Sequence, residues 1–101
     1  DDLVSGIGIF DTQSGAETTV DLSGLFIAIG SDPRTHVVHG QLDLTSEGTI
    51  AVEGRTSHTN LDGVFAAGDV VDSSYRQAIT AAGSGCVAAL DAQHYLEALA
   101  Q

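Results

Sequence analysis

The 101-residue sequence contains no lysine, no tryptophan and no methionine, and its only basic residues are three arginines against 14 acidic residues. The formal net charge is therefore −11. A chain with so little positive charge lacks the surface that neutralises phosphates or anionic lipids, which argues against binding to nucleic acid or to a membrane surface. Its apolar runs are also far shorter than the roughly 20 residues that span a bilayer, so no membrane-spanning helix is predicted.

Cysteine is almost absent too. The single residue, Cys86, excludes an internal disulfide, a dithiol motif and a cysteine-based zinc site within these residues. This low cysteine content is typical of a reducing compartment, so we expect a cytoplasmic protein. The four histidines have no spacing that gathers three ligands, and no metal site is predicted. Cys86 stands within a predicted helix, where we expect a buried structural thiol.

Several segments have the pattern of short strands. Residues 3–10 alternate apolar with small or polar residues, and residues 17–20 can pair back across the turn at 11–15, which predicts a hairpin within 3–24. The apolar run 25–29 is bounded by glycines and predicts a central strand buried on both faces. Residues 42–44, 49–52 and 64–67 predict further short strands.

The pattern becomes helical from Tyr75 to Leu99, where apolar and small residues recur three or four positions apart. Four residues before it could cap this helix: Asp69, Asp72, Ser73 and Ser74. The sequence therefore predicts an α/β fold, with a small β-sheet and one long C-terminal helix. Because the chain is short and poor in aromatics, we expect part of its apolar surface to face another segment, a cofactor or another subunit.

The junction between the strand at 64–67 and this helix is the strongest candidate site. Gly68 allows the backbone to turn sharply, and Asp69 follows at the carboxyl end of the strand, where open α/β sheets bind their ligands. A carboxylate there can accept two hydrogen bonds from a sugar-like polyol. The helix N-terminus near Arg76 favours anionic or electron-rich atoms. From the residues alone, Gly68 and Asp69 could equally be a turn and a helix cap.

This junction resembles a known family. Residues 63–69, the following Tyr75-Arg76-Gln77-Ala78 and the run 79–91 are similar to the C-terminal end of bacterial low-molecular-weight thioredoxin reductases. Residues 25–35 and 54–63 resemble the preceding blocks of that family, although proline is common there where this chain has Asp62. The resemblance covers nearly the whole chain from about residue 3.

The resemblance implies the C-terminal half of an FAD/NAD(P)-binding Rossmann-like domain. Residues 3–24 would form a hairpin at the return from the NADPH domain, and residues 25–101 would form a segment of the FAD domain. Asp69 would bind the ribityl chain of FAD, and Arg76, Gln77 and Ala78 would lie against the isoalloxazine. The residues implied in flavin binding are Gly68, Asp69, Val70, Tyr75, Arg76, Gln77 and Ala78.

The same resemblance implies an NADPH-dependent thioredoxin-disulfide reductase, in which electrons pass from NADPH to FAD, to a dithiol and then to thioredoxin. Its expected partners are the remaining N-terminal FAD and NADPH domains, thioredoxin and a second subunit in a homodimer. These residues hold no Gly-x-Gly-x-x-Gly motif and no Cys-x-x-Cys, so we expect them to be a part of such an enzyme that is inactive alone. Two alternatives are the flavoprotein subunit of alkyl hydroperoxide reductase and a non-catalytic scaffold module.

Overall fold

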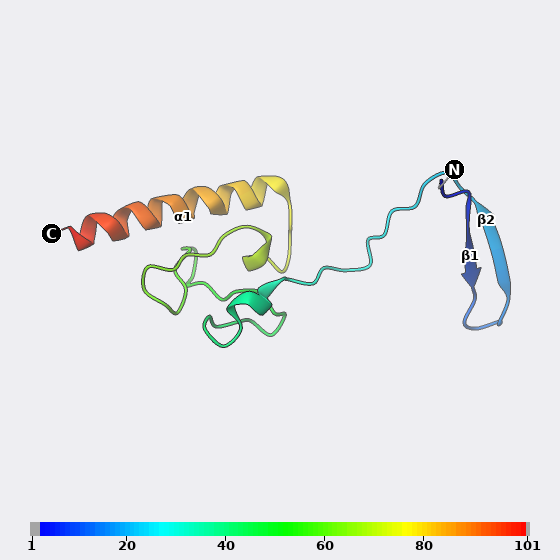
Figure 1. Ribbon diagram of the computed structural model, residues 1–101, viewed down its shortest axis with the longest axis horizontal. Coiled ribbons are helices and arrows are strands. Elements are labelled where there is room, and N and C mark those ends of the chain that lie inside the picture. The colour runs from blue at the N-terminus through cyan, green and yellow to red at the C-terminus, as the bar shows by residue number, and fades with distance from the viewer. Residues whose placement is uncertain (1–2, 101) are drawn as a thin grey trace. The chain divides into compact units, whose positions relative to one another are not determined.

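The computed structural model describes residues 3–100, which divide into two units, one ending at Gly30 and the other beginning at Ser31. The first unit contains an antiparallel hairpin of β1 (Gly6–Phe10) and β2 (Glu17–Asp21), shown in blue in Figure 1. At its turn the Asp11 carboxylate accepts the N–H groups of Gln13 and Ser14, at 2.8 and 3.0 Å. The hairpin predicted within residues 3–24 is therefore confirmed.

The central strand predicted at residues 25–29 is wrong for this chain. The segment has no regular secondary structure, and its Phe26 and Ile29 side chains are 99% and 94% exposed. A central strand needs a hydrogen-bonded neighbour on each side. Within the described residues the sheet has only the two hairpin strands, so the segment has no partner to pair with. Its apolar side chains are left in contact with solvent, as expected for a chain with unpartnered surface.

The second unit packs around a small core formed by Leu42, Ile50 and Ala66. The predicted strands that contribute these residues are reduced to isolated antiparallel bridges, Leu44 with Ile50 and His58 with Phe65. Each bridge pairs one residue with one partner, so neither extends into the ladder of hydrogen bonds that makes a strand. A 3-10 helix, Thr35–Val38, follows the loop that contains Pro33.

The long helix α1 spans Ala78–Leu99 and confirms the predicted C-terminal helix (yellow to red in Figure 1). Its N-cap is Gln77, whose N–H donates to Thr80 Oγ1 at 3.2 Å, so the four predicted caps are wrong. The chain makes a separate turn between residues 72 and 76 before the helix begins, which moves those side chains away from the cap position. No helix in residues 3–100 is long and apolar enough to cross a membrane.

None of the residues of α1 is buried, although one face of the helix contacts the loops of the second unit. Cys86 is exposed, so the prediction of a buried thiol is wrong here. A helix that packs on one side only cannot bury a residue on its outer face. Ile79, which is 80% exposed, is another apolar side chain of α1 without cover.

Candidate functional site

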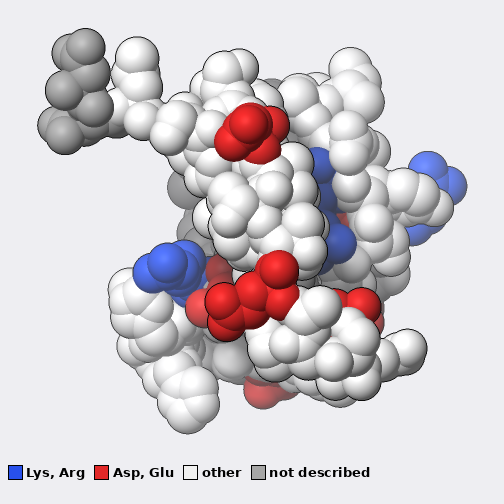
Figure 2. Space-filling model, turned by 90° about the vertical axis from the view of Figure 1, so that its right-hand side faces the viewer, with Lys and Arg blue, Asp and Glu red and all other residues white. Residues whose placement is uncertain are grey.

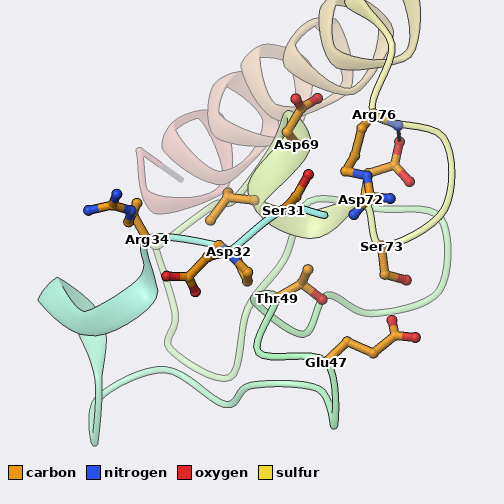
Figure 3. A pocket seen from close by; sticks show the side chains of 11 residues that line it. Ser31, Asp32, Arg34, Glu47, Thr49, Asp69, Asp72, Ser73 and Arg76 are labelled. Atoms are coloured by element: carbon orange, nitrogen blue, oxygen red, sulfur yellow. Dashed lines mark hydrogen bonds between the residues drawn. The ribbon is translucent and has the colours of Figure 1, made fainter. Parts of the chain in front are cut away.

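A cavity of about 500 Å³ opens in the second unit beside the loop that precedes α1 (Figure 3). Residues from three stretches of the chain meet around it: the loop before the first 3-10 helix, the turn at 47–49 and the segment 69–76. The lining residues are Ser31, Asp32, Pro33, Arg34, Glu47, Thr49, Asp69, Val70, Asp72, Ser73 and Arg76.

Gly68 sets the direction of the chain at the edge of this cavity. Its φ of 83° and ψ of −162° lie in a region that a side chain rarely adopts, so the position requires glycine. Its N–H donates to Ser84 Oγ on α1 at 2.8 Å, and that hydroxyl donates to the Ala81 carbonyl at 2.9 Å. The sharp turn predicted from the sequence is therefore present and is tied to the helix.

Asp69 follows this turn and opens a 3-10 helix, Asp69–Val71. Its side chain is exposed and lines the cavity, and its carboxylate accepts no hydrogen bond from any other described residue. Val70 anchors the same turn, because its carbonyl accepts the N–H of Ile50 in the core at 2.9 Å. The loop thus places the Asp69 carboxylate at the cavity, and the hydrogen bond between Ile50 and Val70 attaches the backbone of this loop to the core.

Asp72 is the residue whose role sequence reasoning missed. It was expected to cap the helix, but its carboxylate accepts three consecutive N–H groups before the helix, from Ser74, Tyr75 and Arg76, at 2.9, 2.8 and 2.9 Å. These bonds, first that of Tyr75 and then that of Arg76, lower the pKa of Asp72. The Asp-Ser-Ser run at 72–74 is a local signal for such a turn, because aspartate side chains often bond backbone N–H groups two residues on.

The remaining predicted residues lie around the start of α1. Arg76 lines the cavity, whereas Tyr75, Gln77 and Ala78 do not, and Tyr75 is 71% exposed. The Gln77 N–H is engaged by Thr80 Oγ1, while the Ala78 N–H has no acceptor among the described residues. Of the seven predicted residues, the structure brings Asp69, Val70 and Arg76 to the cavity and Gly68 to its edge.

The charges around the cavity are mixed. Arg34 and Arg76, two of the three basic residues of the chain, line it together with four acidic residues. Most of the face drawn in Figure 2 is white, formed by residues that are neither acidic nor basic. The cavity therefore offers both hydrogen-bond acceptors and cationic donors to a ligand.

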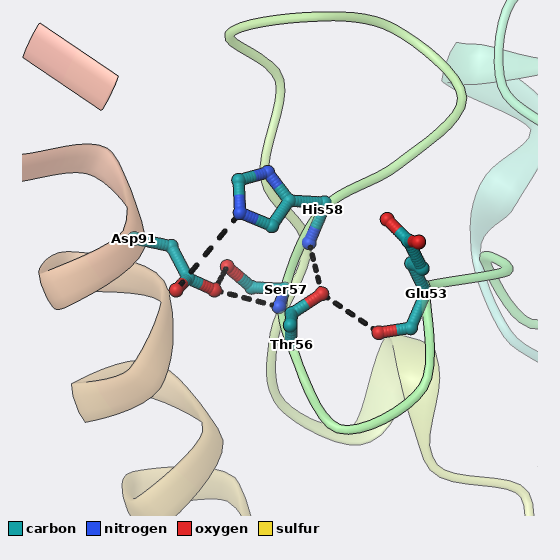
Figure 4. Close-up of polar contacts among 5 residues, drawn as sticks. All are labelled: Glu53, Thr56, Ser57, His58 and Asp91. Carbon is teal, nitrogen blue, oxygen red and sulfur yellow. Dashed lines mark hydrogen bonds and ion pairs between the residues drawn. The ribbon is translucent and has the colours of Figure 1, made fainter. Parts of the chain in front are cut away.

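A second polar cluster links the loop at 53–58 to α1 (Figure 4). The Ser57 N–H and O–H groups donate to Asp91 Oδ2 at 2.8 and 2.7 Å, and His58 Nε2 lies 4.0 Å from Asp91 Oδ1. The hydrogen bonds from Ser57 lower the pKa of Asp91 more than the nearby His58 does. Because the Ser57 hydroxyl donates to the carboxylate and not to the histidine, this cluster is an anchor and not an activated nucleophile.

Comparison with known proteins identifies the family. A sequence model described as pyridine nucleotide-disulphide oxidoreductase matches residues 5–85. The chain belongs to that family. It is 56% identical over 96 residues to a thioredoxin reductase of Mycolicibacterium smegmatis and 58% identical over 97 residues to one of Streptomyces clavuligerus. These alignments cover 95% and 96% of this chain but 31% and 30% of the relatives, so the chain spans about a third of their length.

Solved structures give the same result for the fold of this chain. Thioredoxin reductase from Giardia duodenalis matches with a TM-score of 0.74 and 42% identity, covering 94% of this chain and 31% of that one. Thioredoxin reductase from T. acidophilum matches with a TM-score of 0.71 and 33% identity, covering 94% of this chain and 31% of that one. The predicted fold class, a part of an FAD/NAD(P)-binding fold with a small sheet and one long helix, is confirmed.

Proposed function

We propose that residues 68–78 form part of the FAD site of an NADPH-dependent thioredoxin-disulfide reductase. The observation that carries this proposal is the Asp69 carboxylate, which lines a cavity and accepts no hydrogen bond from the rest of residues 3–100, in a chain whose relatives are named thioredoxin reductases. A second support is the start of α1, where the Ala78 N–H has no acceptor among the described residues.

The donor and acceptor groups of the cavity fit a flavin nucleotide. The Asp69 carboxylate can accept hydrogen bonds from the hydroxyls of a ribityl chain. The Arg76 side chain, which lines the cavity, can donate to the electron-rich edge of a flavin ring. The Ala78 N–H at the start of α1 is not part of the cavity lining, but it is a further donor at the positive end of the helix dipole. When bound, FAD would take electrons from NADPH and deliver them to a disulfide.

The proposed reaction needs a redox-active dithiol and nucleotide-binding motifs that these residues do not contain. One cysteine cannot form the dithiol, and no Gly-x-Gly-x-x-Gly motif is present for either nucleotide. We therefore propose that residues 3–24 and 25–101 supply a hairpin and a flavin-domain segment to a larger polypeptide, and that NADPH, thioredoxin and a second subunit contact that polypeptide. The cytoplasmic location and the inactivity of the chain alone also remain predictions.

The test is flavin retention in the complete polypeptide that carries these residues. Asp69→Ala should release FAD during purification, measured as the ratio of visible flavin absorbance to protein. The matched control is Asp62→Ala, because Asp62 is an exposed aspartate outside the cavity. Full flavin occupancy in Asp69→Ala would contradict the proposal. A wild-type protein with no flavin absorbance would favour the scaffold alternative.

The choice between the two enzyme alternatives needs a separate assay. With FAD bound, a thioredoxin-disulfide reductase consumes NADPH when oxidised thioredoxin is added. NADPH consumption that requires a peroxide and a peroxidase partner, and not thioredoxin, would favour the flavoprotein subunit of alkyl hydroperoxide reductase. The relatives named above support the first outcome.

A further inference from the structure

The backbone at Arg76 has an unusual conformation. Its φ of 50° is the only positive value at a non-glycine residue among those described. Side chains other than glycine rarely adopt this left-handed region, because the Cβ crowds the backbone. Such conformations persist only where the surrounding structure holds them, and they cluster at ligand sites. Arg76 lines the cavity, so this backbone conformation determines where its side chain leaves the chain.

The group that holds this conformation is the carboxylate of Asp72. Oδ1 accepts the N–H groups of Ser74 and Tyr75, and Oδ2 accepts the N–H of Arg76 itself at 2.9 Å. Figure 3 shows this carboxylate beside the Arg76 backbone at the cavity. Thr80 Oγ1 lies 3.4 Å from the same Oδ2, which ties the turn to the first turn of α1. One side chain thus fixes three consecutive peptide groups between Asp69 and the helix.

We propose that Asp72 is a positioning residue, which holds Arg76 in the left-handed conformation so that its side chain is preset for the flavin. This inference rests on the proposed function, because it assumes that the cavity binds FAD. Without the Asp72 bond, Arg76 would leave the left-handed region, and only a fraction of the molecules would remain competent to bind. The apparent dissociation constant rises by the inverse of that fraction.

An asparagine at position 72 separates the Arg76 bond from the other two. The amide oxygen of asparagine can still accept the N–H groups of Ser74 and Tyr75, but its NH₂ group replaces Oδ2 and faces the Arg76 N–H donor to donor. We expect Asp72→Asn to raise the dissociation constant for FAD about tenfold. The matched control is Asp62→Asn, which removes the same charge outside the cavity and should leave the constant unchanged.

A double-variant comparison distinguishes positioning from general support of the loop. Glycine adopts positive φ at no steric cost, so Arg76→Gly removes the need for the Asp72 bond while it also removes the guanidinium. Asp72→Asn should therefore weaken FAD binding about tenfold in the wild-type background and about twofold or less in the Arg76→Gly background. FAD binding to the apoprotein of the complete polypeptide is measured by quenching of flavin fluorescence.

Each outcome decides the inference. Equal losses in the two backgrounds, or no loss in Asp72→Asn, would overturn the role of Asp72 while leaving the flavin site in place. A wild-type protein that binds no FAD would overturn the proposed function and this role together. Amide hydrogen exchange tests the inference without a variant: the Arg76 N–H should exchange more slowly than the Ala78 N–H, which has no acceptor within residues 3–100. Equally fast exchange would contradict it.

Discussion

Replacement of Gly63 by alanine should lower the free energy of unfolding more than replacement of Gly40, a glycine with nearly the same φ. Gly63 has φ +76°, and a Cβ built there lies 3.0 Å from both Cε1 and the hydroxyl oxygen of Tyr95 on α1. The left-handed backbone alone costs an alanine about 1–2 kcal/mol. To relieve this approach the Tyr95 ring must shift by a few tenths of an ångström, which weakens its edge contact with Phe65, whose ring centroid lies 5.9 Å away; such a contact contributes at most about 0.5–1.5 kcal/mol. The expected loss is therefore above the backbone cost and at most about 3.5 kcal/mol.

Gly40 provides the matched control. Its φ is +78°, but nothing lies within 4 Å of a Cβ at that position, so Gly40→Ala should cost only the backbone term of about 1–2 kcal/mol. Urea unfolding followed by far-UV circular dichroism gives the free energy of unfolding of each variant. In a Tyr95→Ala background the excess cost of Gly63→Ala should disappear. Equal costs of the two glycine replacements in the wild-type background would refute this account of the contact.

Two further predictions concern the hydrogen bonds between Ser57 and Asp91 and the exposed apolar segment 25–29. Because the pKa of Asp91 is lowered from 3.8, its ionised form stabilises the fold above about that pH, and this contribution is lost as the pH falls through the lower folded-state value. Asp91→Asn should therefore reduce stability at pH 7 and flatten the acid dependence of urea unfolding below about pH 4, and an unchanged acid dependence would contradict the assignment. In the 101-residue chain alone, Phe26→Ser should reduce self-association in sedimentation velocity, because Phe26 is 99% exposed, and an unchanged mass distribution would count against that surface.

Elements that depend on local sequence could be predicted. The hairpin needs only the alternation of β1, the turn at Asp11 and the arm at β2, all of which are neighbours in the chain. The helix α1 follows from spacing within one segment. Gly68 and Asp69 could be placed at the end of an apolar run for the same reason, and the structure puts both at the cavity or its edge.

Features that depend on distant partners could not be predicted. The apolar run 25–29 has the composition of a buried strand, but burial needs neighbouring strands that the described residues do not supply. Cys86 shows the same effect, since an apolar position on a helix is buried only when something packs against that face. In both cases the composition indicates that the side chains are suited to burial, but it does not identify the segment or subunit that would pack against them.

The Asp72 turn was missed for a different reason. An aspartate shortly before a helix is a common cap, and the sequence does not state how many residues separate the turn from the first helical residue. In the folded chain the Asp72 carboxylate accepts the N–H groups of the three residues before Gln77, and Arg76 then has positive φ. Capping and turn formation use the same side-chain chemistry, so composition alone does not distinguish them.

The most direct test of the central claim is a crystal structure of the complete polypeptide with FAD. The account predicts that the flavin enters the cavity lined by Asp69 and Arg76, with an Asp69 carboxylate oxygen within hydrogen-bond distance of a ribityl hydroxyl. A structure with FAD bound elsewhere and Asp69 out of reach of the ribityl chain would contradict it.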